Sequence, residues 1–387
     1  MTLSAAVGQY RSLDGHEAAE KAAHQALEQL AGVPLCLGVV IFSQAYEVEE
    51  VLSGVTAVLG NTPLLGFCTP AELSQTGQMT RSVVVALLGG TEVHARADWW
   101  ENFAEDSGEV TRLMVDTLRL HEQTGGALLV FTDGLRGDST TLNQQLPRGF
   151  QVAGAATGGD FYRGRSFQIG GGVGGNGGIA AALLEGRVLL GIGSAHGWEP
   201  IGTLLEVTHS RGMWVRTLDN KPASEKYAEV LGYEARDWLF PPLNRLVRLY
   251  PLGVERHGSE ELDIRTPIRM EADGSLRMNI SVTDGASSYL MVGSAEACQR
   301  AAQQATQQAL EALGGARPVL ALVLVDVAWQ MLMDSDPGRE IAVVDAVLGG
   351  KVPVAGGYVL GQIDRQSSDE AVRVRNQHIQ VVIFGEV

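Results

Sequence analysis

Polar side chains that could bind a ligand recur at matching places in three eight-residue segments of this chain. Each segment begins with glycine, carries a carboxylate or its amide analogue at the seventh position, and has an apolar residue at the eighth. The segments are Gly66–Leu73, Gly154–Phe161 and Gly356–Ile363. The hydroxyls of Thr69 and Thr157 and the acceptors of Glu72, Asp160 and Gln362 are the groups that such segments offer to a polar ligand.

The glycine that begins each segment lies at the end of a short apolar strand. Glycine at such a place lets the backbone turn sharply or approach a neighbour closely, and open α/β sheets bind ligands at the carboxyl ends of their strands. The alternative is that these polar side chains tie down their own turns, as threonine and aspartate commonly do. Recurrence does not decide between the two, because a structural turn would also recur in duplicated units.

His196 and Trp198 lie in a stretch rich in turn residues. A histidine beside a tryptophan there could be a haem axial ligand or a hydrogen-bond donor to an anionic ligand, and a buried indole N–H needs a partner. A histidine with ordinary surface partners is the alternative. The eight histidines and three cysteines form no His-x-x-x-His and no Cys-x-x-Cys spacing, so we expect no metal enzyme.

Arg265 and Tyr358 complete the candidate binding residues. A guanidinium matches a carboxylate with two parallel hydrogen bonds, and Pro267 holds the preceding Thr266 extended, which places Arg265 at a strand end. A salt bridge to a nearby acid is the alternative for Arg265. Tyr358 could close the site from the third segment, and burial in the core is its alternative.

Local signatures of catalysis are missing. The chain has no Gly-x-Ser-x-Gly and no phosphate-binding Gly-x-x-x-x-Gly-Lys. Gly172, Gly174 and Gly177 match the dinucleotide fingerprint in form, but a strand-like run follows them rather than a helix, so we predict a hairpin loop. The sequence favours a non-catalytic protein. A hydrolase or transferase whose groups assemble in space stays an alternative.

The elements that position these residues form three degenerate α/β units. Each segment is preceded by an amphipathic helical stretch, an apolar strand, a second helical stretch and a short strand. The apolar strands, at residues 35–43, 127–132 and 319–326, read as buried on both faces, which requires helices packed on a sheet. Between the second and third units, residues 191–293 are rich in alternating stretches typical of half-exposed antiparallel strands. We therefore predict a mixed α/β fold with an antiparallel portion.

Length and composition bound the remaining properties. At 387 residues the chain is long for a single core, and the turn around residue 220 predicts two domains, 1–220 and 221–387. The net charge of -16 argues against nucleic acid as a partner. An odd number of separated cysteines, the lack of an export signal and the lack of a long apolar run predict a cytoplasmic protein without membrane insertion.

An ordered set of short motifs resembles the FIST family, with its paired N-terminal and C-terminal domains. The first segment is similar to the family's Gly-Cys-Ser-Thr-x-Gly-Glu signature. Further matches are Gly197–Gly202, Val207-Thr208, Leu218–Ala223, Arg265-Thr266-Pro267, Gly274–Leu276 and Gly356-Gly357-Tyr358. The chain departs from the pattern at three places. Phe67 replaces the usual cysteine and Cys68 follows it, Pro70 and Ala71 replace a small-Gly pair, and Gln362 replaces a glutamate.

The resemblance implies a sensory, small-ligand-binding protein of bacterial signal transduction, with amino acids and related metabolites as proposed ligands. Some members of this broad family bind haem, sense nitric oxide and regulate a partner histidine kinase, so haem held by His196 is the alternative. Since clefts between domains are favoured ligand sites, we predict a non-catalytic receptor with its ligand in an inter-domain cleft and a separate signalling partner.

Overall fold

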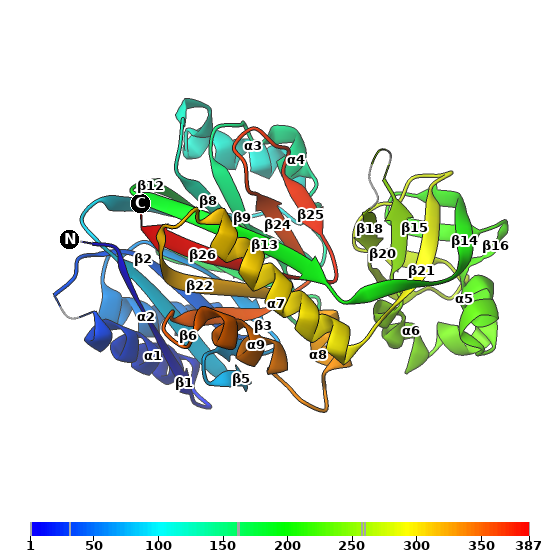
Figure 1. The fold of residues 1–387 in the computed structure, drawn as a ribbon, viewed down its shortest axis with the longest axis horizontal. Coiled ribbons are helices and arrows are strands. Elements are labelled where there is room, and N and C mark those ends of the chain that lie inside the picture. Colours follow the sequence, from blue (N-terminus) through cyan, green and yellow to red (C-terminus); the bar gives the residue numbers. More distant parts are fainter. Residues whose placement is uncertain (1, 31, 161–162, 257, 259–260, 387) are drawn as a thin grey trace. The chain divides into compact units, whose positions relative to one another are not determined.

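The computed structural model describes residues 2–30, 32–160, 163–256, 258 and 261–386 (Figure 1). The chain forms two compact units. The larger unit comprises Met1–His196, Gln299–Val374 and His378–Val387, and the smaller unit comprises Gly197–Cys298 with Arg375–Gln377. The predicted division into domains 1–220 and 221–387 concerns domains defined by sequence, and it stays a prediction.

The larger unit contains three repeats of one order of elements. The first repeat is β1 (Ser4–Arg11), α1 (Gly15–Gln29), β2 (Leu35–Ser43), α2 (Val48–Leu59), β3 (Leu64–Thr69), β4 (Glu72–Ser74), β5 (Gly77–Met79) and β6 (Ser82–Gly89). The second is β7 (Val93–Trp100), α3 (Ser107–Thr117), β8 (Ala127–Asp133), α4 (Thr141–Gln145), β9 (Gln151–Thr157), β10 (Phe167–Gly170), β11 (Val173–Asn176) and β12 (Ile179–Gly186). The third is β13 (Val188–His196), α7 (Ala295–Ala312), β22 (Arg317–Asp326), α8 (Val327–Leu332), α9 (Arg339–Leu348), β23 (Val354–Val359), β24 (Gly361–Arg365), β25 (Arg373–Arg375) and β26 (His378–Glu386).

Each repeat contributes four strands to its own sheet in the same order. These four are β1-β6-β2-β3, β7-β12-β8-β9 and β13-β26-β22-β23, in which only the last pair of each is parallel. Two further strands complete each sheet and come from another repeat: β10-β11 joins β3, β24-β25 joins β9, and β4-β5 joins β23. The three repeats therefore exchange hairpins in a closed cycle.

The central strand of each sheet is buried on both faces, as predicted, and its residues alternate between two cores. In β2, Leu37, Val39 and Ile41 join a core shared by all three sheets, while Val40 and Phe42 pack with α1 and α2. The rings of Phe67 and Phe131 meet in the shared core with centroids 4.5 Å apart. On the third sheet, β13, β26 and β22 run side by side beside α7 (Figure 1).

The glycine that begins each repeated segment has one structural cause. Gly66, Gly154 and Gly356 lie opposite Val40, Val130 and Val323 on the parallel neighbour strand, at equivalent register positions. A Cβ atom on these glycines would lie 2.2, 1.8 and 2.2 Å from the carbonyl oxygens of those valines. Because no side chain fits such a distance, the close approach of the two parallel strands requires glycine.

The smaller unit is inserted between β13 and α7 of the third repeat, where the other repeats have short linkers. Its sheet has the order β18-β17-β21-β14-β15-β20-β19, with β16 beside β15. The elements are β14 (Trp198–Arg211), β15 (Trp214–Leu218), β16 (Lys221–Pro222), α5 (Ala223–Leu231), α6 (Leu243–Leu246), β17 (Leu252–Glu255), β18 (Leu262–Arg265), β19 (Pro267–Met270), β20 (Leu276–Met278) and β21 (Ser287–Gly293). The pairings are antiparallel, which confirms the predicted mixed α/β fold with an antiparallel portion.

Two finer predictions, on the glycine-rich stretch and on the cysteines, are also confirmed. The glycine-rich stretch near residue 172 forms the β10-β11 hairpin rather than a nucleotide-binding loop. The three cysteines, all among the described residues, are buried and form no disulfide bond. Among the described residues, no helix has the length and apolar content that a membrane span requires.

Candidate functional site

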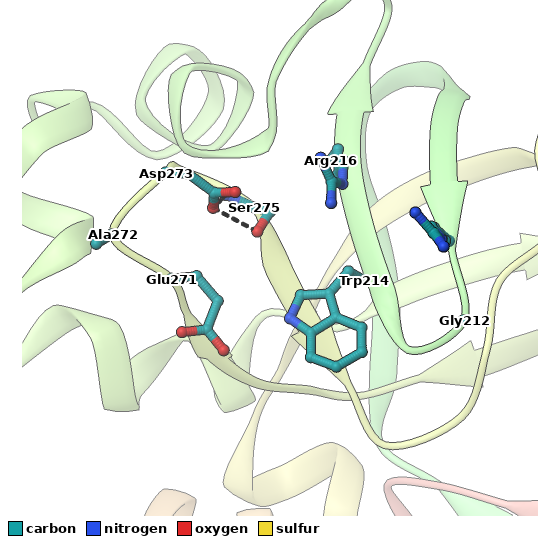
Figure 2. Close-up of a pocket in the computed structure, with 8 residues that line it drawn as sticks. Gly212, Trp214, Arg216, Glu271, Ala272, Asp273 and Ser275 are labelled. Carbon is teal, nitrogen blue, oxygen red and sulfur yellow. Dashed lines mark hydrogen bonds between the residues drawn. The ribbon is translucent and has the colours of Figure 1, made fainter.

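A pocket of about 750 Å³ opens on the solvent face of the sheet in the smaller unit (Figure 2). Two turns build it. The end of β14 and the turn that follows it supply Arg211 and Gly212, and the turn between β19 and β20 supplies Glu271, Ala272, Asp273 and Ser275. Trp214 and Arg216 on β15 complete the lining. Figure 2 shows Glu271, Asp273 and Ser275 on the segment that faces Trp214 and Arg216 of β15.

Strand alternation explains which side chains reach the pocket. In β15, Val215 is buried in one core with Tyr227 and Trp238, whereas its neighbours Trp214 and Arg216 point to the opposite, exposed face. Val215 pairs with the buried Leu276 of β20, so the exposed and buried faces match across the two strands. The amphipathic pattern of the strand therefore presents an indole and a guanidinium together.

The acidic side of the pocket is held by local hydrogen bonds. Asp273 accepts bonds from the backbone N–H of Ser275 at 3.0 Å and from its hydroxyl at 2.5 Å. These bonds to Ser275 lower the pKa of Asp273, with Arg216 contributing its positive charge, so this carboxylate is ionised at neutral pH. Glu271 accepts a bond from Arg269 Nε at 3.0 Å.

The basic side of the pocket carries cations without such partners. Within the described part of the chain, Arg211 and Arg216 form no hydrogen bond and no ion pair with another side chain. Trp214 between them is 40% exposed, and the guanidinium of Arg277 lies 5.7 Å from the centroid of its ring. Guanidinium groups bind carboxylates, carboxylates bind ammonium groups, and the indole packs on apolar atoms. The pocket can hold a small molecule that carries both charges.

A second pocket, of about 620 Å³, lies in the larger unit near the end of α2. Its lining is formed by Thr56, Gly60, Asn61, Thr62, Pro63, Leu64, Arg96, Ala97, Gly171 and Gly172. The one charged residue in this lining, Arg96, already forms an ion pair with Glu185 at 3.5 Å. The pocket in the smaller unit therefore offers the richer chemistry.

Predicted site residues of the first and third segments lie close together, but they are buried in the interior rather than exposed in a pocket. The Thr69 hydroxyl accepts a bond from the Tyr358 backbone N–H at 2.9 Å and lies 3.0 Å from the Tyr358 carbonyl oxygen, so it joins the first segment to the third. Tyr358 is 1% exposed, and its hydroxyl bonds to Glu340 at 2.5 Å and to Gln78 at 2.8 Å. Burial raises the pKa of Tyr358, and that of Glu340 as well.

Glu72 is also fully buried, on the hairpin that joins the third sheet. Its Oε2 accepts bonds from the backbone N–H of Ser82 at 3.0 Å and from the Ser82 hydroxyl at 2.7 Å. Its Oε1 has no hydrogen-bond partner among the described residues. Burial, which outweighs the bonds from Ser82, raises the pKa of Glu72 to about 8.

The structural equivalent of Glu72 in the second repeat is Gln168, a residue that the sequence motif missed. Glu72, Gln168 and Gln362 each pair opposite the residue that follows a motif glycine, namely Gly357, Phe67 and Ala155. Asp160 lies earlier, in a turn where it pairs with Arg163 and bridges to Arg165. Gln168 follows Thr157 by eleven residues, whereas Glu72 follows Thr69 by three, and this longer connection displaces the seventh position of the motif.

The amides of Gln168 and Gln362 differ in their surroundings. Gln168 Nε2 donates to the hydroxyls of Thr157 and Ser166, each at 2.9 Å, and its Oε1 accepts from the Gly178 N–H at 3.1 Å. The third repeat has Val359 and Leu360 at the corresponding places. The amide of Gln362 is buried without a hydrogen-bond partner among the described residues.

The remaining predicted residues lie at strand ends. The His196 ring packs edge-on against His378 with centroids 4.9 Å apart. Trp198 is 3% exposed and donates its indole N–H to the Leu249 carbonyl at 3.2 Å. Arg265 ends β18 and pairs with Asp263 at 3.1 Å, and burial lowers the pKa of Arg265. None of the nine predicted residues lines either of these two pockets, and direct ligand contact by them stays a prediction.

The sequence pattern predicts only part of the lining of the pocket in the smaller unit. The alternation through residues 214–218 predicts a half-exposed strand, which puts Trp214 and Arg216 on one face. The pairing of β15 with β20, which brings residues 271–275 opposite, has no local signal.

Two family models match this chain. The FIST N domain matches residues 36–221, and the FIST C domain matches residues 223–365. No curated protein gives a significant match. Among solved structures, T. maritima PurL complexed with ADP is 11% identical, with a TM-score of 0.26, and the comparison covers 100% of this chain and 72% of that chain. T. maritima PurL complexed with ATP is 12% identical over the same shares, with a TM-score of 0.25. Scores this low carry no argument about fold or function.

Proposed function

Because this chain belongs to the FIST family, whose domains are sensory domains of signal-transduction proteins, we propose that it is a non-catalytic receptor for an amino acid or similar small metabolite. We place the ligand in the pocket lined by Arg211, Trp214, Arg216, Glu271 and Asp273. Its signal passes to a separate partner such as a histidine kinase in the bacterial cytoplasm, as the family resemblance implies.

The observation that carries this proposal is the opposition of charges across the indole. Arg211 and Arg216 are free to bind a carboxylate, while Asp273 is ionised and faces them from the other turn. An α-amino acid carries a carboxylate and an ammonium group on one carbon atom, and such a zwitterion complements both sides of the pocket. Trp214 offers an apolar surface to the side chain of the ligand.

The origin of the lining supports the same location. Arg211, Trp214 and Arg216 belong to the stretch that matches the FIST N domain, whereas residues 271–275 belong to the stretch that matches the FIST C domain. A bound ligand would join a turn of one sequence domain to a turn of the other. Ligand sites commonly lie where two domains contribute residues.

A thermal-shift screen of the twenty amino acids tests the proposal. We expect at least one amino acid to raise the unfolding temperature, since a ligand that binds only the folded state stabilises it. Arg216→Ala should abolish this rise. The matched control is Arg236→Ala, which removes an exposed arginine of the smaller unit that pairs with Glu234 outside the pocket. If no amino acid stabilises the protein, or if Arg216→Ala responds like the parent protein, the proposal is wrong.

The two alternatives are tested on the same protein. An absorption spectrum of freshly purified protein reports on haem, for which His196 is the predicted axial ligand. That histidine packs against His378 and lines neither described pocket. Chemical conversion of the bound amino acid during incubation would favour an enzyme.

A further inference from the structure

We propose that the pocket of the smaller unit selects a dicarboxylic α-amino acid, of the glutamate or aspartate type, over neutral amino acids. This inference rests on the proposed function and adds the class of ligand. The charges of the pocket and of its direct neighbours, and the way the strands align them, support this ligand class.

Arginines outnumber carboxylates in and directly around the pocket of the smaller unit. The lining holds two arginines and two carboxylates, Arg211, Arg216, Glu271 and Asp273. Their direct neighbours add two more arginines, because Arg269 binds Glu271 and Arg277 lies over Trp214. The site therefore has an excess of positive charge in a protein whose net charge is -16. An excess of this sign favours a ligand with a net negative charge.

Three of these arginines and Trp214 lie in line across four neighbouring strands. Arg211 on β14 pairs with Trp214 on β15, Trp214 pairs with Arg277 on β20, and Arg277 pairs with Arg269 on β19. Residues directly opposite on neighbouring antiparallel strands point to the same face of the sheet. Three arginines and the indole thus form one cross-strand row, and Arg216 lies two residues along β15 on the same face.

The charged groups of the pocket match one ammonium group and two carboxylates of a ligand. Arg269 neutralises Glu271, which leaves Asp273 as the acceptor for one ammonium group. Arg211 and Arg216 have no ion-pair partner among the described residues, so they can bind two carboxylates. A neutral amino acid has one carboxylate and uses only one of these cations. A dicarboxylic amino acid uses both, and its methylene groups pack on Trp214.

Isothermal titration calorimetry of the full chain with matched ligand pairs tests this inference. Glutamate and glutamine have nearly the same shape and differ in one charge, as do aspartate and asparagine. We expect the acid of at least one pair to bind at least about tenfold more tightly than its amide, because a charge-assisted hydrogen bond is about twice as strong as a neutral one. The preference should weaken as salt is added, since the site is open to solvent.

Variants locate the preference. Arg216→Gln and Arg211→Gln each remove one cation and keep a polar side chain, and at least one of them should bring the affinities for acid and amide to within about threefold. Arg236→Gln, outside the pocket, should keep the full difference. Circular dichroism and the unfolding temperature show that each variant is folded before its affinity is interpreted.

The outcomes separate the two proposals. If amino acids bind but glutamine and asparagine bind as tightly as glutamate and aspartate, the inference on ligand class is overturned and the receptor proposal stands. If glutarate or succinate, which lack the amino group, bind as tightly as the amino acids, the ammonium assignment to Asp273 fails and the inference is overturned. If no amino acid binds at all, the proposed function itself fails.

Discussion

The larger unit buries its polar residues at the points where the repeats meet, whereas the smaller unit exposes charged residues without partners around a pocket. Thr69, Glu72 and Tyr358 lie in the interior and bond to one another's segments or to neighbouring strands. Arg211 and Arg216 lie on an open sheet face and have no ion-pair partner among the described residues. The two regions show the difference between polar groups that fix a fold and polar groups that are available to a ligand.

The position of the smaller unit in the chain sharpens this comparison. It interrupts the third repeat between β13 and α7, and it has no counterpart in the first two repeats. The repeated sequence segments therefore reflect what the packing of the core and the exchange of hairpins require. The residues that suit ligand binding lie in the part that does not repeat, which is where a duplicated scaffold is free to acquire a site.

The largest effect is expected from a motif glycine. Gly154→Ala places a Cβ atom against the Val130 carbonyl, 1.8 Å away in the present backbone, so the parallel strands must separate. We expect the free energy of unfolding to fall by about 3 kcal/mol or more in chemical denaturation. Gly125→Ala is the matched control, because nothing lies within 4 Å of its added Cβ atom. Equal stability of the two variants would contradict the structural role of the motif.

The second prediction concerns the pocket. The double variant Arg211→Ala with Arg216→Ala should weaken binding of the stabilising amino acid about 100-fold in calorimetry, since two charge-assisted contacts are lost. Its unfolding temperature without ligand should stay near that of the parent protein, because both side chains lack ion-pair partners. A folded double variant with a clearly lower unfolding temperature but unchanged affinity would contradict the comparison between the two units.

The third prediction returns to the repeat junction. Thr69→Val keeps the shape of the side chain but leaves the buried Tyr358 N–H without its acceptor. We expect a loss of about 2 kcal/mol in the free energy of unfolding, as for other buried groups left unpaired. Thr69→Ser keeps the hydroxyl and should lose clearly less. If valine is tolerated as well as serine, the hydroxyl does not join the first segment to the third.

The prediction with the smallest effect per pH unit is a change in pH dependence. Burial raises the pKa of Glu72 to about 8, from an ordinary value of 4.5. Between these pH values the folded state keeps a proton that the unfolded chain has released, so the free energy of unfolding falls as the pH rises, by up to about 1.4 kcal/mol per pH unit. Glu72→Gln should remove this contribution and leave that of Glu340 in place.

Glutamine at this position is also what the other two repeats carry, as Gln168 and Gln362. We therefore expect Glu72→Gln to fold normally and to be more stable than the parent protein near pH 8. Denaturation series at pH 5 and pH 8 measure the difference. An equal loss of stability in both proteins between these two pH values would contradict a buried, protonated Glu72.

The sequence alone predicted the three repeats, the strands buried on both faces and the antiparallel portion, because hydrophobic period and glycine placement are local properties. It could not predict the exchange of hairpins between repeats, since no local pattern tells which sheet a hairpin joins. It placed Asp160 where the structure has Gln168, because a longer turn separates the second motif from its hairpin.

The site was less accessible to sequence reasoning than the fold. In an acidic chain no basic cluster is visible, yet Arg211, Arg277 and Arg269 line up because three antiparallel pairings bring distant residues together. Strand alternation predicts only that Trp214 and Arg216 share a face. Which acids lie opposite them depends on the register of β15 with β20, and that register is a property of the folded sheet.

The central claim is that the ligand binds in the inserted unit and not at the repeat junctions. Calorimetric titration of the stabilising amino acid into Arg216→Ala and Tyr358→Phe, side by side, tests it most directly. We predict that Arg216→Ala weakens binding at least about tenfold, while Tyr358→Phe, which removes a buried hydroxyl of the junction, binds as tightly as the parent protein. Unchanged binding by Arg216→Ala together with loss of binding by a folded Tyr358→Phe would contradict the claim.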